Sequence, residues 1–244
     1  MSTVAQLVRD KVEEMPSGKV FDYGIFVTAL PDAGVESIAL SLSRLSRQGV
    51  IERLEKGKYY KPKKSSYGKI RPKESDIIAL LTIKNTERIG YPTGLPVFNQ
   101  MGLTTQVSNT FIIATSKPKE PKDLQGIKVK YIKRLGQFLE EEIRLWQILD
   151  AIQDINAIPD ATPDESVKVL KRKIGELPRK DQERLVGLAE AYQPRTRALL
   201  GAMMEYYFDE IDTGILKKKI NRLSKFDIGV SAITLPNKSS WNIK

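Results

Sequence analysis

The sequence predicts a multi-domain α+β protein with an N-terminal winged helix-turn-helix, a small mixed α/β middle and a helical C-terminal part. A helix that leads directly into a β-hairpin within residues 35–60 is typical of a recognition helix and its wing. β-Branched and alternating segments between residues 110 and 131 predict strands, whereas helical patterns dominate after Pro159. We expect the winged helix-turn-helix at 1–62, a basic linker at 63–75 and a larger part at 76–244, mixed over 76–158 and mainly helical over 159–244.

Two short helices should precede the recognition helix. Apolar residues recur at helical spacing between Thr3 and Met15, and the segment Pro16–Gly18 ends that pattern. Asp22 is a candidate N-cap for a second helix that runs to about Leu30. Together with the following helix and hairpin, these elements match the size of a winged-helix domain.

The predicted recognition helix ends before Gly49, which occupies the position of a left-handed cap. One face carries apolar residues at helical spacing, namely Val35, Ile38, Ala39, Leu42 and Leu45. The opposite face is rich in hydroxyl and amide groups and finishes in two arginines; its residues are Glu36, Ser37, Leu40, Ser41, Arg44, Arg47 and Gln48.

The hairpin after Gly49 should be the wing. Residues 50–54 and 58–60 have the composition of two strands, joined across a turn that contains Lys56 and Gly57. Strand alternation places at least one of the two adjacent tyrosines, 59 and 60, against the domain core.

Positive charge is concentrated around this hairpin. The chain carries 40 Lys and Arg against 30 Asp and Glu, a formal net charge of +10. Between Arg44 and Lys73, eleven basic residues stand against two acidic ones. Such charges could form an ordinary solvated surface, but their place beside the hairpin favours double-stranded DNA as the partner. The expected DNA-contacting residues are Ser37, Leu40, Ser41, Arg44, Arg47, Gln48, Arg53, Lys56, Lys58, Lys61, Lys63 and Lys64.

The rest of the chain alternates at first between helical and strand patterns. We predict a helix over residues 75–81, strands over 110–115 and 126–131, and a long helix over 138–155. Beyond these segments the pattern is helical, with helix starts after Thr162, Pro178 and Pro194.

Composition excludes several classes of protein. The sequence has no cysteine and no histidine, which excludes disulfides, thiolate or histidine metal sites, and Ser-His-Asp or Cys-His nucleophiles. No apolar run reaches the roughly 20 residues that span a bilayer, and charges from Arg9 onward interrupt any N-terminal signal segment. We therefore expect a cytoplasmic protein without membrane contact, metal or cofactor.

Several short segments resemble a known family. After the winged-helix start, the chain contains Tyr91-Pro92-Thr93-Gly94 and Gly102-Leu103-Thr104-Thr105-Gln106-Val107. Its last part contains Phe226-Asp227-Ile228-Gly229-Val230-Ser231, Leu235-Pro236-Asn237 and Trp241-Asn242-Ile243. Over most of the chain, this combination resembles the AbiEi-type antitoxins and transcriptional regulators of type IV toxin–antitoxin systems.

The resemblance implies a regulator without enzymatic activity. It implies repression of the protein's own promoter through the winged helix, and action against a co-encoded nucleotidyltransferase-like toxin, in the context of phage defence. Residues 76–244 would then form the antitoxin-type domain, and whether they touch the toxin directly stays open. The polar face that includes Ser37, Ser41, Arg44 and Gln48 fits the DNA-binding part.

Two other functions remain open at this stage. Asp209 and Asp212, near Glu210 and the run Lys217–Lys219, could hold magnesium for a nuclease that the winged helix targets. The same carboxylate spacing also occurs on ordinary exposed helices, and the lysine run could be a second phosphate site or a solvated surface. The other possibility is a winged-helix regulator that responds to a small effector, for which the sequence has no signature.

Overall fold

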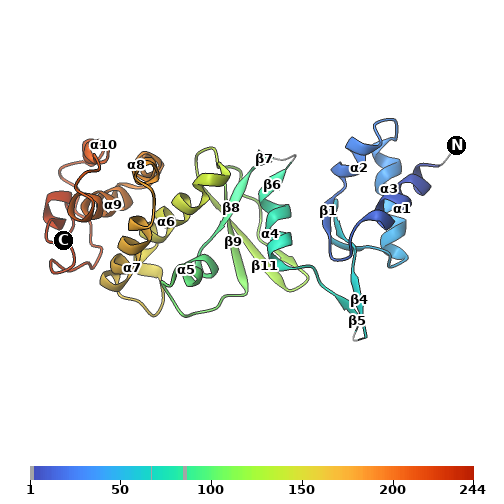
Figure 1. Ribbon diagram of the computed structural model, residues 1–244, viewed down its shortest axis with the longest axis horizontal. Helices are drawn as coiled ribbons and strands as arrows, with labels where there is room; N and C mark the ends of the chain where they lie inside the picture. The colour runs from blue at the N-terminus through green and yellow to red at the C-terminus, as the bar shows by residue number, and fades with distance from the viewer. Residues whose placement is uncertain (1–2, 67, 85–86) are drawn as a thin grey trace. The chain divides into compact units, whose positions relative to one another are not determined.

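The computed structural model describes residues 3–66, 68–84 and 87–244, with only the backbone described at Lys64. Helices alternate with small sheets over these residues, so the predicted α+β class is confirmed (Figure 1). The chain divides into two compact units. The first is Met1–Glu87 together with Lys122–Ile127, and the second is Arg88–Pro121 together with Lys128–Lys244.

The first unit is built from short helices and strands. Its three antiparallel strands β1, β3 and β2 lie in that order in one sheet. The unit's elements are α1 (Val4–Glu14), β1 (Val20–Asp22), α2 (Gly24–Ala29), α3 (Val35–Arg47), β2 (Glu52–Glu55), β3 (Lys58–Tyr60), β4 (Lys63–Ser65), β5 (Gly68–Ile70), α4 (Glu74–Thr82), β6 (Ile83–Lys84) and, from later in the chain, β10 (Lys122–Leu124). β7 (Glu87–Arg88) lies where the chain passes into the second unit.

One apolar cluster holds α1, α2, α3 and this sheet together. Helix α3 contributes Ile38, Leu42 and Leu45, which are buried in the cluster. The ring of Tyr59 on β3 stacks on that of Phe21 on β1, with centroids 6.0 Å apart. The prediction that at least one tyrosine of the hairpin faces the core is therefore confirmed.

The buried face of α3 differs from the predicted one by a rotation about the helix axis. Val35 and Ala39, expected in the apolar stripe, are exposed, whereas Ser41, expected on the outer face, is 6% exposed. At about 100° per residue, Ser41 lies beside the buried Leu45. Its hydroxyl donates to the Ser37 carbonyl at 2.8 Å, which satisfies this polar group within the core.

Residues 63–75, expected as a basic linker, have structure of their own. β4 and β5 form an antiparallel hairpin in which the Ser65 hydroxyl donates to the Gly68 carbonyl at 2.9 Å. The polar, glycine-containing sequence that suggested a linker therefore belongs to this hairpin. Tyr67 itself lies outside the described residues. The first unit continues through α4 to Glu87, beyond the expected boundary at residue 75.

The second unit combines a small mixed sheet with a helical C-terminal part. Strand β9 (Thr110–Thr115) pairs antiparallel with β8 (Gly90–Thr93) and parallel with β11 (Ile127–Lys133), which confirms both predicted strands. The helices are α5 (Leu95–Met101), α6 (Ile143–Gln153), α7 (Pro163–Gly175), α8 (Arg179–Leu188), α9 (Pro194–Tyr207) and α10 (Gly214–Lys218), with 3-10 turns at Glu140–Glu142, Ile155–Ala157, Ala189–Ala191 and Lys238–Trp241. Among the described residues, no helix has both the length and the apolar character that crossing a bilayer requires.

The core of the second unit encloses a charged network centred on Asp150 of α6, which is fully buried. Its carboxylate accepts hydrogen bonds from Arg134, Tyr192 and Tyr91 at 2.7, 2.8 and 3.0 Å. Burial, together with the negative charge of Asp150, raises the pKa of both tyrosines, so their hydroxyls remain donors. The indole of Trp146 packs beside both tyrosine rings.

Candidate nucleic-acid interface

The exposed face of α3 combines short polar side chains with arginines. Ser37, Arg44 and Arg47 are exposed, as the sequence predicts. Leu40 lies among them and is 53% exposed, although its side chain is apolar. Hydrogen-bond donors beside a small apolar group suit the edges of base pairs in the major groove, where the thymine methyl group offers an apolar contact.

Two further basic residues lie at the C-terminal end of α3. Arg9 of α1 donates from Nη2 to Oε1 of Gln48 at 2.6 Å, which leaves the Gln48 NH₂ group available as a donor. Lys69 of β5 pairs with Glu52, and its Nζ comes within 3.2 Å of the position that a Cβ would take at Gly49. No local pattern links these residues to α3. Their proximity arises from the packing of α1 on α3 and from the unexpected β4–β5 hairpin.

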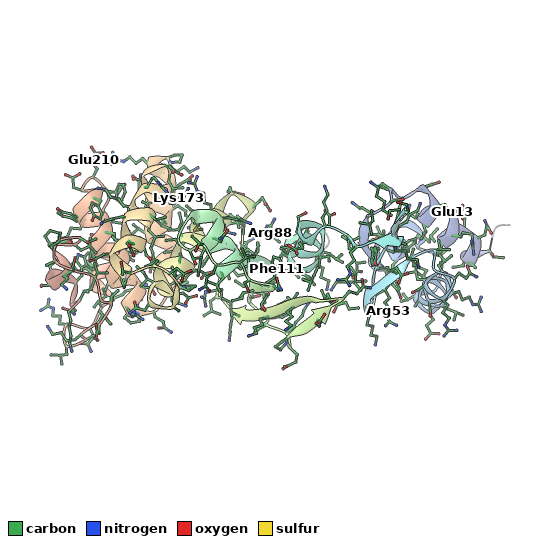
Figure 2. The ribbon with its side chains drawn as sticks, turned by 90° about the horizontal axis from the view of Figure 1, so that it is seen from below. Glu13, Arg53, Arg88, Phe111, Lys173 and Glu210 are labelled. Carbon is green, nitrogen blue, oxygen red and sulfur yellow. The ribbon has the colours of Figure 1, made fainter. Side chains whose placement is uncertain are left out.

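The turn between β2 and β3 is tight and basic. Gly57 has a φ of +79°, a backbone conformation that favours glycine, and Lys56 beside it is exposed. Lys58 is held by Glu55, with Nζ 2.5 Å from Oε1. Arg53 is exposed on β2 and is labelled in Figure 2. The hairpin therefore presents Lys56 and Arg53 to solvent, while Lys58 is engaged within the hairpin.

Glu55 is the acidic centre of this hairpin. It pairs with Lys58 and also with Lys122 of β10, so a segment far along the chain binds the hairpin. Burial tends to raise the pKa of Glu55, but hydrogen bonds from Lys122 and Lys58 outweigh it and hold the pKa below its ordinary value of 4.5. Gln125, in the same segment, accepts a hydrogen bond from the Tyr60 hydroxyl at 3.3 Å.

The predicted DNA-contacting residues have different surroundings. The exposed ones are Ser37, Leu40, Arg44, Arg47, Gln48, Arg53, Lys56 and Lys63. Ser41 is buried, which corrects its placement on the outer face, because its position on the helix lies next to the core. The side chain of Lys64 lies outside the described residues.

Lys61 is also engaged within the unit. Its Nζ donates to the carbonyls of Glu13 and Met15, at 2.6 and 2.8 Å. These carbonyls lie at the C-terminal end of α1, where a cation interacts favourably with the unpaired acceptors and the helix dipole. The sequence offers no signal for this contact, because 46 or more positions separate the partners along the chain.

The carboxylates considered for a nuclease have local partners. Asp212 accepts a hydrogen bond from the backbone N–H of Gly214 at 2.8 Å. Glu210, labelled in Figure 2, accepts from Nη1 of Arg179 at 2.8 Å. Within residues 3–66, 68–84 and 87–244, no group of three or more Asp, Glu, His or Cys could hold a metal ion.

The run of lysines near the C-terminus is also paired. Lys217 lies 3.5 Å from Glu205 and over the ring of Trp241, and Lys219 pairs with Glu190. Two of the three lysines are thus committed to contacts within the second unit, which favours a structural role over a phosphate site.

Comparison with known proteins adds a family and a fold. A family described as "Family of unknown function (DUF6088)" has a model that matches residues 7–184. The crystal structure of the RV2827C protein from Mycobacterium tuberculosis is similar, with a TM-score of 0.53 and 11% sequence identity. The match covers 92% of this chain and 84% of that one, and at this identity it concerns the fold alone. No curated protein matches the sequence.

Proposed function

The chain belongs to DUF6088, a family of unknown function, and we propose that it binds double-stranded DNA through a winged helix-turn-helix. In this proposal α3 is the recognition helix and the β2–β3 hairpin is the wing. The observation that carries the proposal is the exposed arginine-bearing face of α3 beside a basic hairpin, within a segment of strong positive charge.

Five of the exposed residues have roles suited to their chemistry. Arg44 can donate two hydrogen bonds to a guanine, and the available NH₂ group of Gln48 can donate to N7 of an adenine. Arg53, Lys56 and Lys63 contact phosphates, which positions the protein on DNA without reading the sequence.

The resemblance to AbiEi-type antitoxins supports the biological part of the proposal. The protein represses the promoter of its own toxin–antitoxin operon and counteracts a nucleotidyltransferase-like toxin, without enzymatic activity of its own. The second unit carries the antitoxin function. It has an apolar core separate from that of the first unit, which is what a separable activity needs.

A DNA titration tests the central claim. The full-length protein is titrated against labelled duplexes, one from the region upstream of its own gene and one of scrambled sequence, over a series of salt concentrations. We expect tighter binding to the upstream duplex and a steep salt dependence, because each neutralised phosphate contributes about −0.9 to the log–log slope.

The matched control is Lys180→Ala, which removes an exposed lysine from α8 of the second unit and should leave the titration unchanged. Absence of binding to both duplexes at low salt would remove the proposal. Equal affinity for both duplexes would remove the claim of operator recognition.

A further inference from the structure

A cleft in the second unit has the properties of a small-molecule site. Its volume is about 270 Å³, and its walls come from the segment before α6, from α6 itself and from α8 with the turn that follows. An apolar cavity of about 150 Å³ is known to hold benzene, so this cleft has room for a fused two-ring molecule. Its walls are partly apolar, with Leu139 and Leu188 among them.

The wall contains a buried carboxylate with one unpaired oxygen. Glu142 is 6% exposed, and its Oε1 accepts a hydrogen bond from Nε of Arg184, a second residue of the wall, at 2.5 Å. Its Oε2 is buried and has no hydrogen-bond partner among the described residues. An unsatisfied buried acceptor destabilises the folded protein, and a ligand with a hydrogen-bond donor would remove that cost.

The same wall contains an unpaired donor. The indole N–H of Trp146 is buried without an acceptor among the residues described. Gly136 passes close to this ring: a Cβ at that position would lie 2.9 Å from Cη2 and 3.0 Å from Cζ2. Its φ of +143° also favours glycine, so a side chain is excluded here on two grounds. Leu135 and Leu139 belong to the same walls and are exposed, and exposed side chains change rotamers rapidly, so the walls can adjust to a flat ring.

We propose that this cleft binds an uncharged purine base or nucleoside. A purine presents a donor and an acceptor side by side on one edge, which matches the unpaired Glu142 oxygen and the unpaired Trp146 N–H. Its flat rings suit the apolar side chains of the wall. The carboxylates of Glu142 and Glu190 both line the cleft, and their basic partners Arg184 and Lys219 are already engaged. A phosphorylated ligand is therefore disfavoured, because its phosphate would have to compete with these carboxylates for cations that are already paired.

The cleft lies within the second unit, so this inference does not depend on DNA binding by the first unit. If both proposals hold, the protein is a DNA-binding regulator with a purine effector. If the DNA titration fails, the cleft can still be tested by itself.

Calorimetry and fluorescence on the full-length protein test the inference. Adenosine, guanosine, cytidine and adenosine monophosphate are titrated separately, and binding is followed by heat and by tryptophan emission. The chain has two tryptophans, and only Trp146 lines the cleft, so emission should change when a purine nucleoside binds. We expect at least one purine nucleoside to bind at least about tenfold more tightly than cytidine and the monophosphate, a factor that corresponds to 1.4 kcal/mol.

Three variants locate the site. Glu142→Gln replaces an acceptor by an amide and should weaken nucleoside binding at least about tenfold. Leu139→Phe narrows the cleft from a partly exposed position without changing the buried polar groups, and should weaken binding comparably while circular dichroism stays unchanged. Glu176→Gln changes an exposed ion-paired glutamate outside the cleft and should leave the affinity unchanged. Absence of nucleoside binding, tighter binding of the monophosphate, or equal effects of Glu142→Gln and Glu176→Gln would each overturn the proposal.

Discussion

At the scale of single residues, Lys56 and Lys58 differ in their partners although they lie two positions apart. Lys56 is exposed at the turn, whereas Lys58 is bound by Glu55. A lysine that is already paired with a carboxylate neutralises DNA phosphates only weakly, because its charge is balanced before binding. It therefore releases few of the counterions condensed on the DNA. The two lysines should therefore contribute unequally to DNA affinity.

We predict that Lys56→Ala lowers the salt slope of DNA binding by about 0.9, and that Lys58→Ala lowers it by clearly less. The measurement is the DNA titration over a salt series with each variant in the full-length chain. Equal changes in slope would show that the Glu55–Lys58 pair opens on DNA.

The Asp150 network gives a second residue-level prediction. Removal of the carboxylate in Asp150→Ala leaves Arg134 without its buried partner, and we expect a loss of about 3–5 kcal/mol in the free energy of unfolding. Tyr91→Phe removes the hydroxyl's hydrogen bond to Asp150 and its long contact with the Tyr192 hydroxyl at 3.5 Å but leaves the Arg134–Asp150 pair intact, and should cost only about 1 kcal/mol. Both tryptophans lie in the second unit, so urea titrations followed by tryptophan fluorescence report on this unit. Similar losses for the two variants would contradict the central role of Asp150.

At the scale of secondary-structure elements, α3 and the β2–β3 hairpin should act differently on DNA. Arg44→Ala removes a donor from the exposed face of the helix, and we expect a loss of about 1–3 kcal/mol on the operator with little change on random DNA. Titrations of the variant on both duplexes measure this difference. An equal loss on both would assign Arg44 to phosphate contact and remove α3 as the recognition helix.

The hairpin also predicts a pH dependence. The folded state lowers the pKa of Glu55 below 4.5, so its carboxylate stabilises the first unit at pH values above the unfolded pKa. That contribution is lost as the pH falls below 4.5 and through the folded pKa.

Glu55→Gln should therefore destabilise the first unit at neutral pH, and the difference from wild type should shrink in acid. Urea titrations followed by the NMR signal of the buried Ile38 methyl groups measure the effect. A difference that stays constant from pH 7 to below pH 4 would contradict the ion-pair explanation.

The elements that the sequence predicts are those with local signals. α1, α3, β3 and β9 follow from apolar spacing, β-branched runs and turn residues within a few positions. Features that depend on distant residues were missed, namely the rotation of α3 toward the core and the binding of Lys61 by the end of α1. The hairpin at residues 63–70 and the Glu55–Lys58 pair are local, but the polar composition of the hairpin resembles a linker, and charged residues three apart pair only where the turn brings them together. For the same reason, the sequence identifies the charge of the candidate interface but not which cations are engaged. DNA binding itself stays a prediction.

At the scale of the whole molecule, the two units have separate apolar cores. Substitutions in one unit can therefore test whether promoter repression and protection against the toxin are separable. In the full-length chain, Arg44→Ala combined with Arg47→Ala should abolish promoter repression but preserve protection against the toxin. The measurement is cell growth with the toxin expressed from an unrelated promoter, alongside a promoter-reporter assay. Lys180→Ala is the control and should keep both activities. Loss of protection in the double variant, with its fold intact, would show that the two functions are not divided between the units.

Because Lys122 pairs with Glu55, the first unit cannot be completed during synthesis until Lys122 has been translated. The ribosome makes the hairpin early, but the segment Lys122–Ile127 follows only after part of the second unit has been translated. From Lys58 to Lys122 the ribosome adds 64 residues, so at about 5–20 residues per second that interval lasts roughly 3–13 seconds. During this interval Glu55 lacks one of its two partners. The β2–β3 hairpin should therefore be less stable in a nascent chain halted before Lys122 than in the completed protein. Any operator binding would then strengthen only after translation has passed this segment.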